Sequence, residues 1–335
     1  MNKKVGVLLL SLAMMFSVAA CGTKDTPAAS APQQQETQAE NASAANTDNT
    51  ASETRTITYL GQEYTVPVQP AKLVITGSVE SLEDALVLDV HPAGAMTTGG
   101  EFAPMFAKIT DQSEPIGEKA QPNLEAILKL KPDVILASTK FPAEAIEKLG
   151  KIAVTIPVSH IATDWQDNLN LLAELSGKQE QAKQALQNYN DEAQALKEQI
   201  GPVLKDKNVL ILRLRAGSLF IYPEDVFFNP SVYADLGASV PEEVKKAEAQ
   251  QMVTIEQLSQ MNPDYLFVQF AEAENKDNPK ALEELQKNPI WNSINAVKND
   301  NLFVNLVDPT AQGGTAYSKI AFLEALKNSK LVQAK

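Results

Sequence analysis

Two arginines placed two residues apart, Arg213 and Arg215, are the most distinctive candidates for ligand binding in this sequence. Arginine is scarce, with three residues in the chain, whereas lysine supplies the other 26 basic side chains. The apolar run at 209–214 predicts a buried strand, and alternation along it places both arginines on one face near its carboxyl end. Ligands of open α/β sheets bind outside that end, and the guanidinium fork suits carboxylate and chelating oxygens. We therefore predict that both bind a ligand, with salt bridges to nearby acids as the alternative.

Other residues near predicted strand ends could contact the same ligand. Lys140 follows the predicted strand at 134–138, although a solvated surface lysine is the alternative. The segment at 97–102 follows another predicted strand, and its glycines would allow a close approach to the backbone. Aromatic side chains could stack on a ligand or fill the core. The further candidates for ligand binding are therefore Lys140, Thr98, Phe102, Tyr222, Trp291 and Tyr317.

The sequence carries no motif for catalysis or metal binding. It lacks the phosphate-loop pattern G-x-x-x-x-G-K-[ST], the nucleophile turn G-x-S-x-G and the zinc pair H-E-x-x-H. A single cysteine and two distant histidines, His91 and His160, do not favour a cluster of soft metal ligands. We assign neither histidine a role. We expect no catalytic residue, no metal site and no cofactor, so the protein is predicted not to be an enzyme.

The single cysteine, Cys21, follows a segment organised like a secretory signal. Lys3 and Lys4 precede an apolar stretch at 5–18, which is shorter than the ~20 residues of a membrane span. The residues Val-Ala-Ala-Cys-Gly at 18–22 resemble the lipobox of bacterial lipoproteins, with an ordinary signal peptide as the alternative. The resemblance implies removal of 1–20 and lipid attachment to Cys21. The mature protein would then be extracytoplasmic and anchored to the cell membrane by its lipid.

Composition separates a linker from a folded body and narrows the choice of partners. Residues 22–54 contain no Val, Ile, Leu, Met, Phe, Tyr or Trp, so 21–54 is predicted to be the lipidated cysteine and a disordered linker. The chain has 42 acidic and 29 basic residues and a net charge of −13. That excess argues against nucleic-acid binding, because phosphate requires a basic surface.

The folded body is predicted to be α/β, with two Rossmann-like lobes joined by one long helix and a ligand cleft between them. Short apolar strands alternate with helical patterns over 55–163 and again over 202–335, which is typical of parallel sheets. Over 164–201, apolar residues recur at intervals of three and four, which predicts the connecting helix, with a break allowed near Gly177. Gly201 and Pro202 are expected to end it.

An internal repeat relates the two lobes. Residues 123–136 align without a gap on 254–267, with apolar residues matched, Glu125 opposite Glu256 and a Pro-Asp pair in each copy. Each copy predicts a capped short helix, a turn and a buried strand. A carboxylate in the first turn stabilises the positive helix end, which is the simplest role for the two glutamates. The matched placement favours a second role, in which each docks a partner.

Together these features resemble the siderophore- and cobalamin-binding proteins of ABC importers. The resemblance covers about 55–330, and its motifs lie at 122–137, 253–268, 288–299 and 308–319. It implies a monomer that captures a ferric siderophore between its lobes and delivers it to a membrane permease with a cytoplasmic ATPase. In that family, glutamates at the positions of Glu125 and Glu256 pair with arginines of the two permease subunits.

The type of siderophore is a finer expectation. Arg213-Leu214-Arg215 followed by Tyr222-Pro223-Glu224 is similar to hydroxamate-type binders, so we expect a hydroxamate or citrate-hydroxamate chelate. The alternatives in the same fold are a catecholate siderophore, cobalamin or haem. From other classes, the alternatives are a secreted hydrolase and a scaffold lipoprotein.

Overall fold

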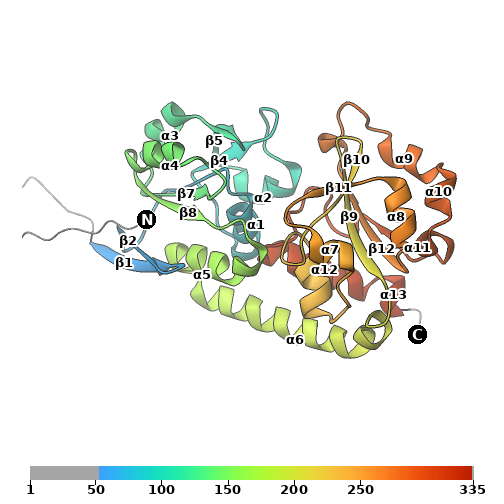
Figure 1. Cartoon of the computed structure of the whole chain (residues 1–335). Helices are drawn as coiled ribbons and strands as arrows, with labels where there is room; N and C mark the ends of the chain where they lie inside the picture. The colour runs from blue at the N-terminus through green and yellow to red at the C-terminus, as the bar shows by residue number, and fades with distance from the viewer. Residues whose placement is uncertain (1–52, 334–335) are drawn as a thin grey trace, which may run out of the picture. The chain divides into compact units, whose positions relative to one another are not determined.

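Residues 53–333 are described by a computed structural model (Figure 1), so the predicted signal segment, Cys21 and nearly all of the predicted linker lie outside the described residues. The described chain opens with an antiparallel hairpin of β1 (Thr54–Tyr59) and β2 (Gln62–Pro67). Leu60 and Gly61 form its turn, both with positive φ. Among the described helices, none has the length and apolarity needed to cross a bilayer.

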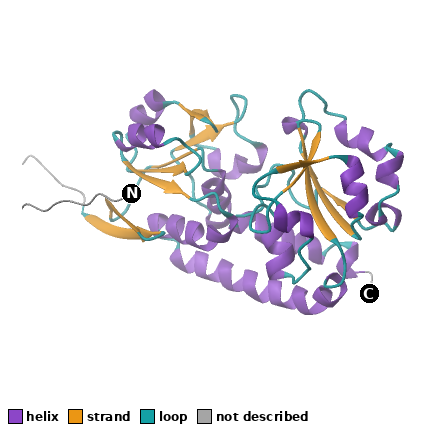
Figure 2. Cartoon of the chain, in the orientation of Figure 1, coloured by secondary structure: helices purple, strands orange, loops and turns teal. Residues whose placement is uncertain are grey.

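The first lobe is built on a six-stranded sheet that is parallel except at one edge (Figure 2). Its strand order is β6-β5-β4-β3-β7-β8, and only the β5–β6 pair is antiparallel. The strands are β3 (Leu73–Thr76), β4 (Gly94–Thr97), β5 (Glu114–Glu118), β6 (Gln121–Pro122), β7 (Val134–Ser138) and β8 (Val154–Val158). The connecting helices are α1 (Val79–Leu88), η1 (Pro104–Phe106), α2 (Ala107–Thr110), α3 (Leu124–Leu130), α4 (Ala143–Gly150) and η2 (Ala162–Asp164).

The second lobe holds a separate five-stranded sheet of order β11-β10-β9-β12-β13 (Figure 2). Its strands are β9 (Val209–Arg215), β10 (Ser218–Ile221), β11 (Gln251–Val253), β12 (Tyr265–Phe270) and β13 (Leu302–Val304). The pairs β9–β12 and β12–β13 are parallel, whereas β10 is antiparallel to both of its neighbours. The helical elements are η3 (Ser231–Asp235), α7 (Glu242–Lys246), α8 (Ile255–Met261), η4 (Glu272–Glu274), α9 (Ala281–Gln286), α10 (Pro289–Asn292), α11 (Asn295–Lys298), α12 (Ala316–Lys327) and α13 (Lys330–Gln333).

Two consecutive helices join the lobes. α5 (Trp165–Ser176) ends at Gly177, whose φ of 72° makes the left-handed cap that permits the break, and α6 (Gln179–Leu204) follows. α6 continues through Pro202 to Leu204, so the predicted end at Gly201 and Pro202 is two or three residues early. Pro202 has no backbone N–H and so removes one hydrogen bond from the last turn, but two further residues keep helical geometry after it. α6 packs against α1 and α5 of the first part of the chain and against α12, α13 and η3 of the second lobe (Figure 1).

The predicted repeat appears as α3–β7 in the first lobe and α8–β12 in the second. Asn123 caps α3, and Thr254 caps α8 in a reciprocal capping box with Gln257. The aspartate of each Pro-Asp turn then accepts backbone N–H groups at the entry of a neighbouring strand. Asp133 Oδ2 bonds the N–H groups of Ala71 and Lys72 ahead of β3, and Asp264 Oδ2 bonds that of Asn208 ahead of β9. Each turn therefore ties two parallel strands together.

The lobes also meet directly, through α1 and the segment before α12. Glu83 and Asp84 in α1 are 0% and 1% exposed. Glu83 accepts hydrogen bonds from the backbone N–H of Gln312 at 2.8 Å and from the hydroxyls of Thr315 and Ser318, and Asp84 accepts one from the N–H of Ala316 at 3.3 Å. Carboxylates of the first lobe thus bind the N-terminus of a helix in the second.

A buried lysine, Lys319, lies one turn further along α12 and is 2% exposed. Its Nζ lies 2.7 Å from Asp235 Oδ2 in η3 and about 5 Å from the ring centres of Trp165 in α5 and Tyr189 in α6. The Tyr189 hydroxyl donates to the same carboxylate oxygen at 2.6 Å. One cation therefore joins side chains from α5, α6, η3 and α12.

Close backbone packing at the lobe junction makes Gly314 a sensitive position. A Cβ at Gly314 would lie 2.3 Å from Ala162 Cβ and 2.7 Å from Ala162 Cα in η2. We predict that Gly314→Ala pushes these segments apart and destabilises the protein by about 1–3 kcal/mol, as overpacking does. Urea unfolding followed by circular dichroism measures this change.

Gly150→Ala is the matched control for that prediction. Gly150 ends α4, has open space around its Cβ position and does not adopt positive φ. This variant is expected to be as stable as the unaltered protein or slightly more stable, because alanine favours helix. Equal stability of the Gly314 and Gly150 variants would contradict the steric argument.

Candidate ligand-binding cleft

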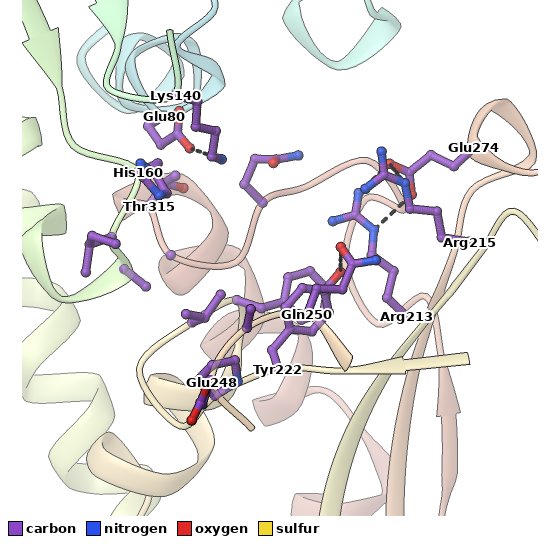
Figure 3. Close-up of a pocket in the computed structure, with 18 of the residues that line it drawn as sticks. Glu80, Lys140, His160, Arg213, Arg215, Tyr222, Glu248, Gln250, Glu274 and Thr315 are labelled. Atoms are coloured by element: carbon purple, nitrogen blue, oxygen red, sulfur yellow. Dashed lines mark hydrogen bonds and ion pairs between the residues drawn. The ribbon is translucent and has the colours of Figure 1, made fainter. Parts of the chain in front are cut away.

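A cavity of about 530 Å³ lies between the lobes. The first lobe contributes Glu80, Lys119, Lys140, His160, Ile161 and Ala162. The second lobe contributes Arg213, Arg215, Tyr222, Pro223, Val226, Phe227, Glu248, Ala249, Gln250, Glu274, Gln312, Gly314 and Thr315. In Figure 3, Glu80, Lys140 and His160 of the first lobe lie across the cavity from Arg213, Arg215 and Glu274 of the second. The volume falls within the usual range for sites that bind small molecules.

The carboxyl ends of parallel strands carry the basic side chains of the lining. Lys119 follows β5, Lys140 follows β7 and His160 follows β8, while Arg213 and Arg215 end β9. This placement follows the general rule that open α/β sheets bind ligands beyond the carboxyl ends of their strands.

Arg213 is held rigidly in the wall of the cleft. It is 7% exposed, and its Nε and Nη2 donate to Glu274 Oε2 and Oε1 at 2.8 and 2.6 Å, which is a bidentate pair. Its guanidinium carbon lies 5.4 Å from the ring centre of Phe227. The charge of Arg213 is therefore largely neutralised within the protein, as the salt-bridge alternative anticipates, although its side chain still lines the cleft.

Three further cations in the cleft are less tightly paired. Arg215 Nε lies 3.9 Å from Glu274 Oε1, and Lys140 Nζ lies 3.4 Å from Glu80 Oε1, with both basic side chains about half exposed. Lys119 has no ion-pair partner among the described residues. Lys119 is exposed at the mouth of the cleft, yet the protein atoms around it lower the pKa of its ammonium. The charges of Lys140 and Arg213 act in the same direction, and those of Glu80 and Glu274 oppose it. The three side chains bring weakly paired positive charge to a shared cavity.

Glu80 is the buried acid of the cleft. It lies in the first turn of α1 and is 6% exposed, with Lys140 as its ion-pair partner. The positive end of the helix favours a carboxylate at this position. Three acids, Glu80, Glu248 and Glu274, face four basic side chains, Lys119, Lys140, Arg213 and Arg215, so the cavity is cationic on balance by a single charge.

His160 offers a hydrogen-bond donor to the cleft. Thr139 Oγ1 accepts a hydrogen bond from the backbone N–H of His160 at 3.3 Å. The hydroxyl hydrogen of Thr139 is therefore available to bond the ring nitrogen Nδ1 of His160, which lies 2.7 Å away. This geometry favours the neutral tautomer protonated on Nε2. Burial and the charge of Lys140 lower the pKa of the imidazole, which keeps it neutral.

An aromatic wall completes the second-lobe side. Tyr222 and Phe227 pack with ring centres 4.9 Å apart, and the Tyr222 hydroxyl lies 3.4 Å from Gln250 Oε1. Burial raises the pKa of Tyr222, so its phenol stays protonated and can donate a hydrogen bond. The cavity therefore combines charged and apolar surfaces.

Four of the eight predicted ligand-binding residues line the cavity: Arg213, Arg215, Lys140 and Tyr222. The other four do not. Trp291 in α10 is fully buried in the core and does not line this cavity. Thr98 and Phe102 follow β4, and Tyr317 is the second residue of α12, two positions after the lining residue Thr315.

The sequence does not predict several of the residues that line the cavity. Lys119 follows β5, whose sequence Glu-Pro-Ile-Gly-Glu has no apolar run, so neither the strand nor its end is apparent. His160 was assigned no role, yet it lines the cavity, as do Glu80, Glu274 and Gln250. The two docking candidates, Glu125 and Glu256, lie outside this cavity and are exposed at the starts of α3 and α8.

Comparisons with known proteins agree with this architecture. A family model described as periplasmic binding protein matches residues 76–305. The iron-uptake system-binding protein of Bacillus subtilis is 49% identical over 323 residues, which cover 96% of this chain and 97% of the relative. A probable siderophore-binding lipoprotein of the same organism, YfiY, is 27% identical and covers 90% of each chain.

A solved structure gives the same picture. The triscatecholate siderophore-binding protein FeuA of Bacillus subtilis, crystallised with ferri-bacillibactin, matches with a TM-score of 0.79 and 52% identity. The match covers 83% of this chain and 98% of that one. The chain therefore belongs to the periplasmic binding protein family and is a binding protein rather than an enzyme.

Proposed function

We propose that this protein captures a ferric tris-catecholate siderophore in the cleft and delivers it to the permease of an ABC importer. The observation that carries the proposal is the set of three weakly paired cations, Lys119, Lys140 and Arg215, facing one cavity. The similarity to the iron-uptake protein and to FeuA supports the same class of ligand.

Charge distinguishes catecholate from hydroxamate chelates. Three catecholate dianions around ferric iron leave a net charge of minus three, whereas three hydroxamates leave the iron centre neutral. Three available cations therefore suit the tris-catecholate, since buried charge is favourable only when it is paired. The expected preference for hydroxamates finds no such support, and we propose the catecholate alternative in its place.

Iron is cargo in this proposal, and the protein need not coordinate it. A hexadentate siderophore already supplies six oxygen donors to the metal. The described residues hold no cluster of histidine, cysteine and acidic side chains with the geometry of a metal site. The lining would instead recognise the outside of the chelate, through charge, the Nε2–H of His160 and the aromatic wall.

Titration of intrinsic fluorescence tests the ligand class. Ferric enterobactin should quench the protein at submicromolar to micromolar concentrations, whereas ferrioxamine, ferric schizokinen and cobalamin should bind more weakly because they carry less negative charge. Lys119→Met, Lys140→Met and Arg215→Met should each weaken enterobactin binding at least about tenfold, since hydrogen bonds to charged groups contribute ~1.5–3 kcal/mol.

Lys183→Met is the matched control, because Lys183 is exposed on α6 and does not line the cavity. It should leave enterobactin affinity unchanged. Tighter binding of ferrioxamine than of ferric enterobactin would contradict the charge argument. An equal loss of enterobactin affinity in the Lys183 variant and in the cleft variants would show that the three cleft cations have no specific role in binding.

Delivery would use the two exposed glutamates of the repeat. Glu125 and Glu256 are exposed in the first turns of α3 and α8, at matching places in the two lobes. Such a pair suits a partner with two similar subunits that each carry a basic residue, because charge complementarity sets orientation and encounter rate. The protein would act as a monomer tethered outside the cytoplasm by lipid on Cys21.

The double variant Glu125→Ala/Glu256→Ala should abolish most uptake of radiolabelled ferric enterobactin by cells while leaving solution affinity unchanged. Glu144→Ala is the control, since Glu144 is likewise exposed in the first turn of a helix, α4. Normal uptake by the double variant would disprove docking. Lost solution binding would indicate a role in folding instead.

A further inference from the structure

Helix α1 links the cleft to the lobe junction through three acidic side chains. Glu80 lines the cavity, while Glu83 and Asp84, three and four residues later, lie on the same face of the helix and reach the second lobe. All three are nearly or fully buried. Among the described residues, neither Glu83 nor Asp84 has a lysine, arginine or histidine as an ion-pair partner.

Glu83 holds part of the cleft wall in place. Its Oε1 accepts the N–H of Gln312 at 2.8 Å, and its Oε2 accepts the hydroxyls of Thr315 and Ser318. Gln312 and Thr315 themselves line the cavity. A change in the charge or position of this one carboxyl group would therefore act directly on the binding surface.

The surroundings of Glu83 are dominated by negative or neutral groups. On α1 it neighbours Glu80 and Asp84, and on α12 it faces Tyr317, whose pKa is raised by burial and by the nearby charges of Asp308 and Glu83. Lys319 of α12 binds Asp235 instead, and Lys140 binds Glu80. Near the start of α5, the pKa of the Tyr59 phenol is raised mainly by burial. The nearby charges of Asp164, Asp167 and Asp84 raise it further.

These surroundings favour the protonated forms. Burial raises the pKa of Glu83 to about 7, opposed in part by the hydroxyls of Ser318 and Thr315 and the N–H of Gln312. Burial and the charges of Glu83 and Glu80 raise the pKa of Asp84 well above its ordinary value. At neutral pH Glu83 is therefore ionised in only part of the molecules, and the protonated form of Asp84 beside it is likewise favoured.

We propose that Glu83 is a positioning residue of the cleft that takes up a proton, supplied by the buffer acid, when an anionic ferric chelate binds. This inference rests on the proposed function. A trianion in the cavity adds negative potential beside Glu80 and hence along α1 toward Glu83. Its ionised form is thereby disfavoured further. The neutral form can still accept the N–H of Gln312 through Oε1, while its new Oε2–H donates to one of the two hydroxyls, Thr315 or Ser318, which then accepts. The affinity for the chelate should accordingly fall as pH rises through neutrality, because binding takes up a proton and the proton concentration decreases.

Isothermal titration calorimetry of the full protein with ferric enterobactin measures this uptake. At pH 7, heats in phosphate and in Tris buffer, which differ in ionisation enthalpy, should report uptake of up to roughly half a proton per ligand, because Glu83 is about half ionised. Affinity at pH 8.5, where the chelate remains intact, should be roughly a few fold weaker than at pH 7. Binding with identical heats in both buffers would overturn the inference alone, whereas no binding would overturn the proposed function with it.

Variants identify the group that takes up the proton. Glu83→Gln should lose the uptake and flatten the pH profile, whereas Glu114→Gln, an exposed glutamate on β5, should keep both. Lys119 and His160 also titrate in the cleft. Full uptake in Glu83→Gln, with loss in Lys119→Met or His160→Gln, would assign the proton elsewhere and reject the proposal.

Thermal denaturation without ligand provides a second measurement. A folded-state pKa above the unfolded value of 4.5 stabilises the protein fully below that value, and this contribution is lost as pH rises through about 7. The melting temperature of the unaltered protein should therefore fall relative to that of Glu83→Gln between pH 5 and pH 8. A constant difference across this range would contradict a proton on Glu83.

Discussion

Carboxyl groups buried without cations connect the two lobes, and the shape of the cleft depends on them. Removing Glu83 and Asp84 from water costs free energy unless hydrogen-bond donors replace the solvent. Those donors come from the segment that leads into α12, in the other lobe. Neither lobe can satisfy these groups alone, so their arrangement is specified together. The cations at the strand ends face one cavity because this junction sets the distance between the sheets.

Helix α12 connects the buried carboxyl groups of α1 to the helices that join the lobes. Its first turn receives the carboxyl groups of α1, and Lys319 in its next turn binds Asp235 beside the rings of Trp165 and Tyr189. Removing one partner of such a buried pair would leave an uncompensated charge, which is far costlier than losing a surface contact. The chain's last long helix therefore fixes the connecting helices against both lobes, and the cleft wall at Gln312–Thr315 is its immediate extension.

Local patterns in the sequence predict the lobes, the connecting helix and the repeat. The spacing of apolar residues along the chain distinguishes strands from helices without knowledge of any distant contact. Arg213, Arg215 and Lys140 follow from the rule that ligands bind at strand ends. Lys119 could not be found this way, since the strand before it lacks an apolar run. Nor could Trp291 be excluded, because an aromatic residue has the same appearance in a core and in a binding site. In the sequence, Glu83 cannot be distinguished from an exposed glutamate on a helix. Its burial depends on contacts with residues 312–318, which are distant in the chain.

The pairing of Arg213 with Glu274 has a thermodynamic consequence for recognition. Two hydrogen bonds and the Phe227 ring hold the guanidinium in one orientation before any ligand arrives. The conformational entropy of that long side chain is lost during folding, so association need not lose it again. Lys119, Lys140 and Arg215 retain their freedom and must be ordered by the incoming anion. The cleft thus combines one fixed arginine with three adaptable cations, which would let a single binding protein accept chelates that share an anionic iron centre but differ in the scaffold around it.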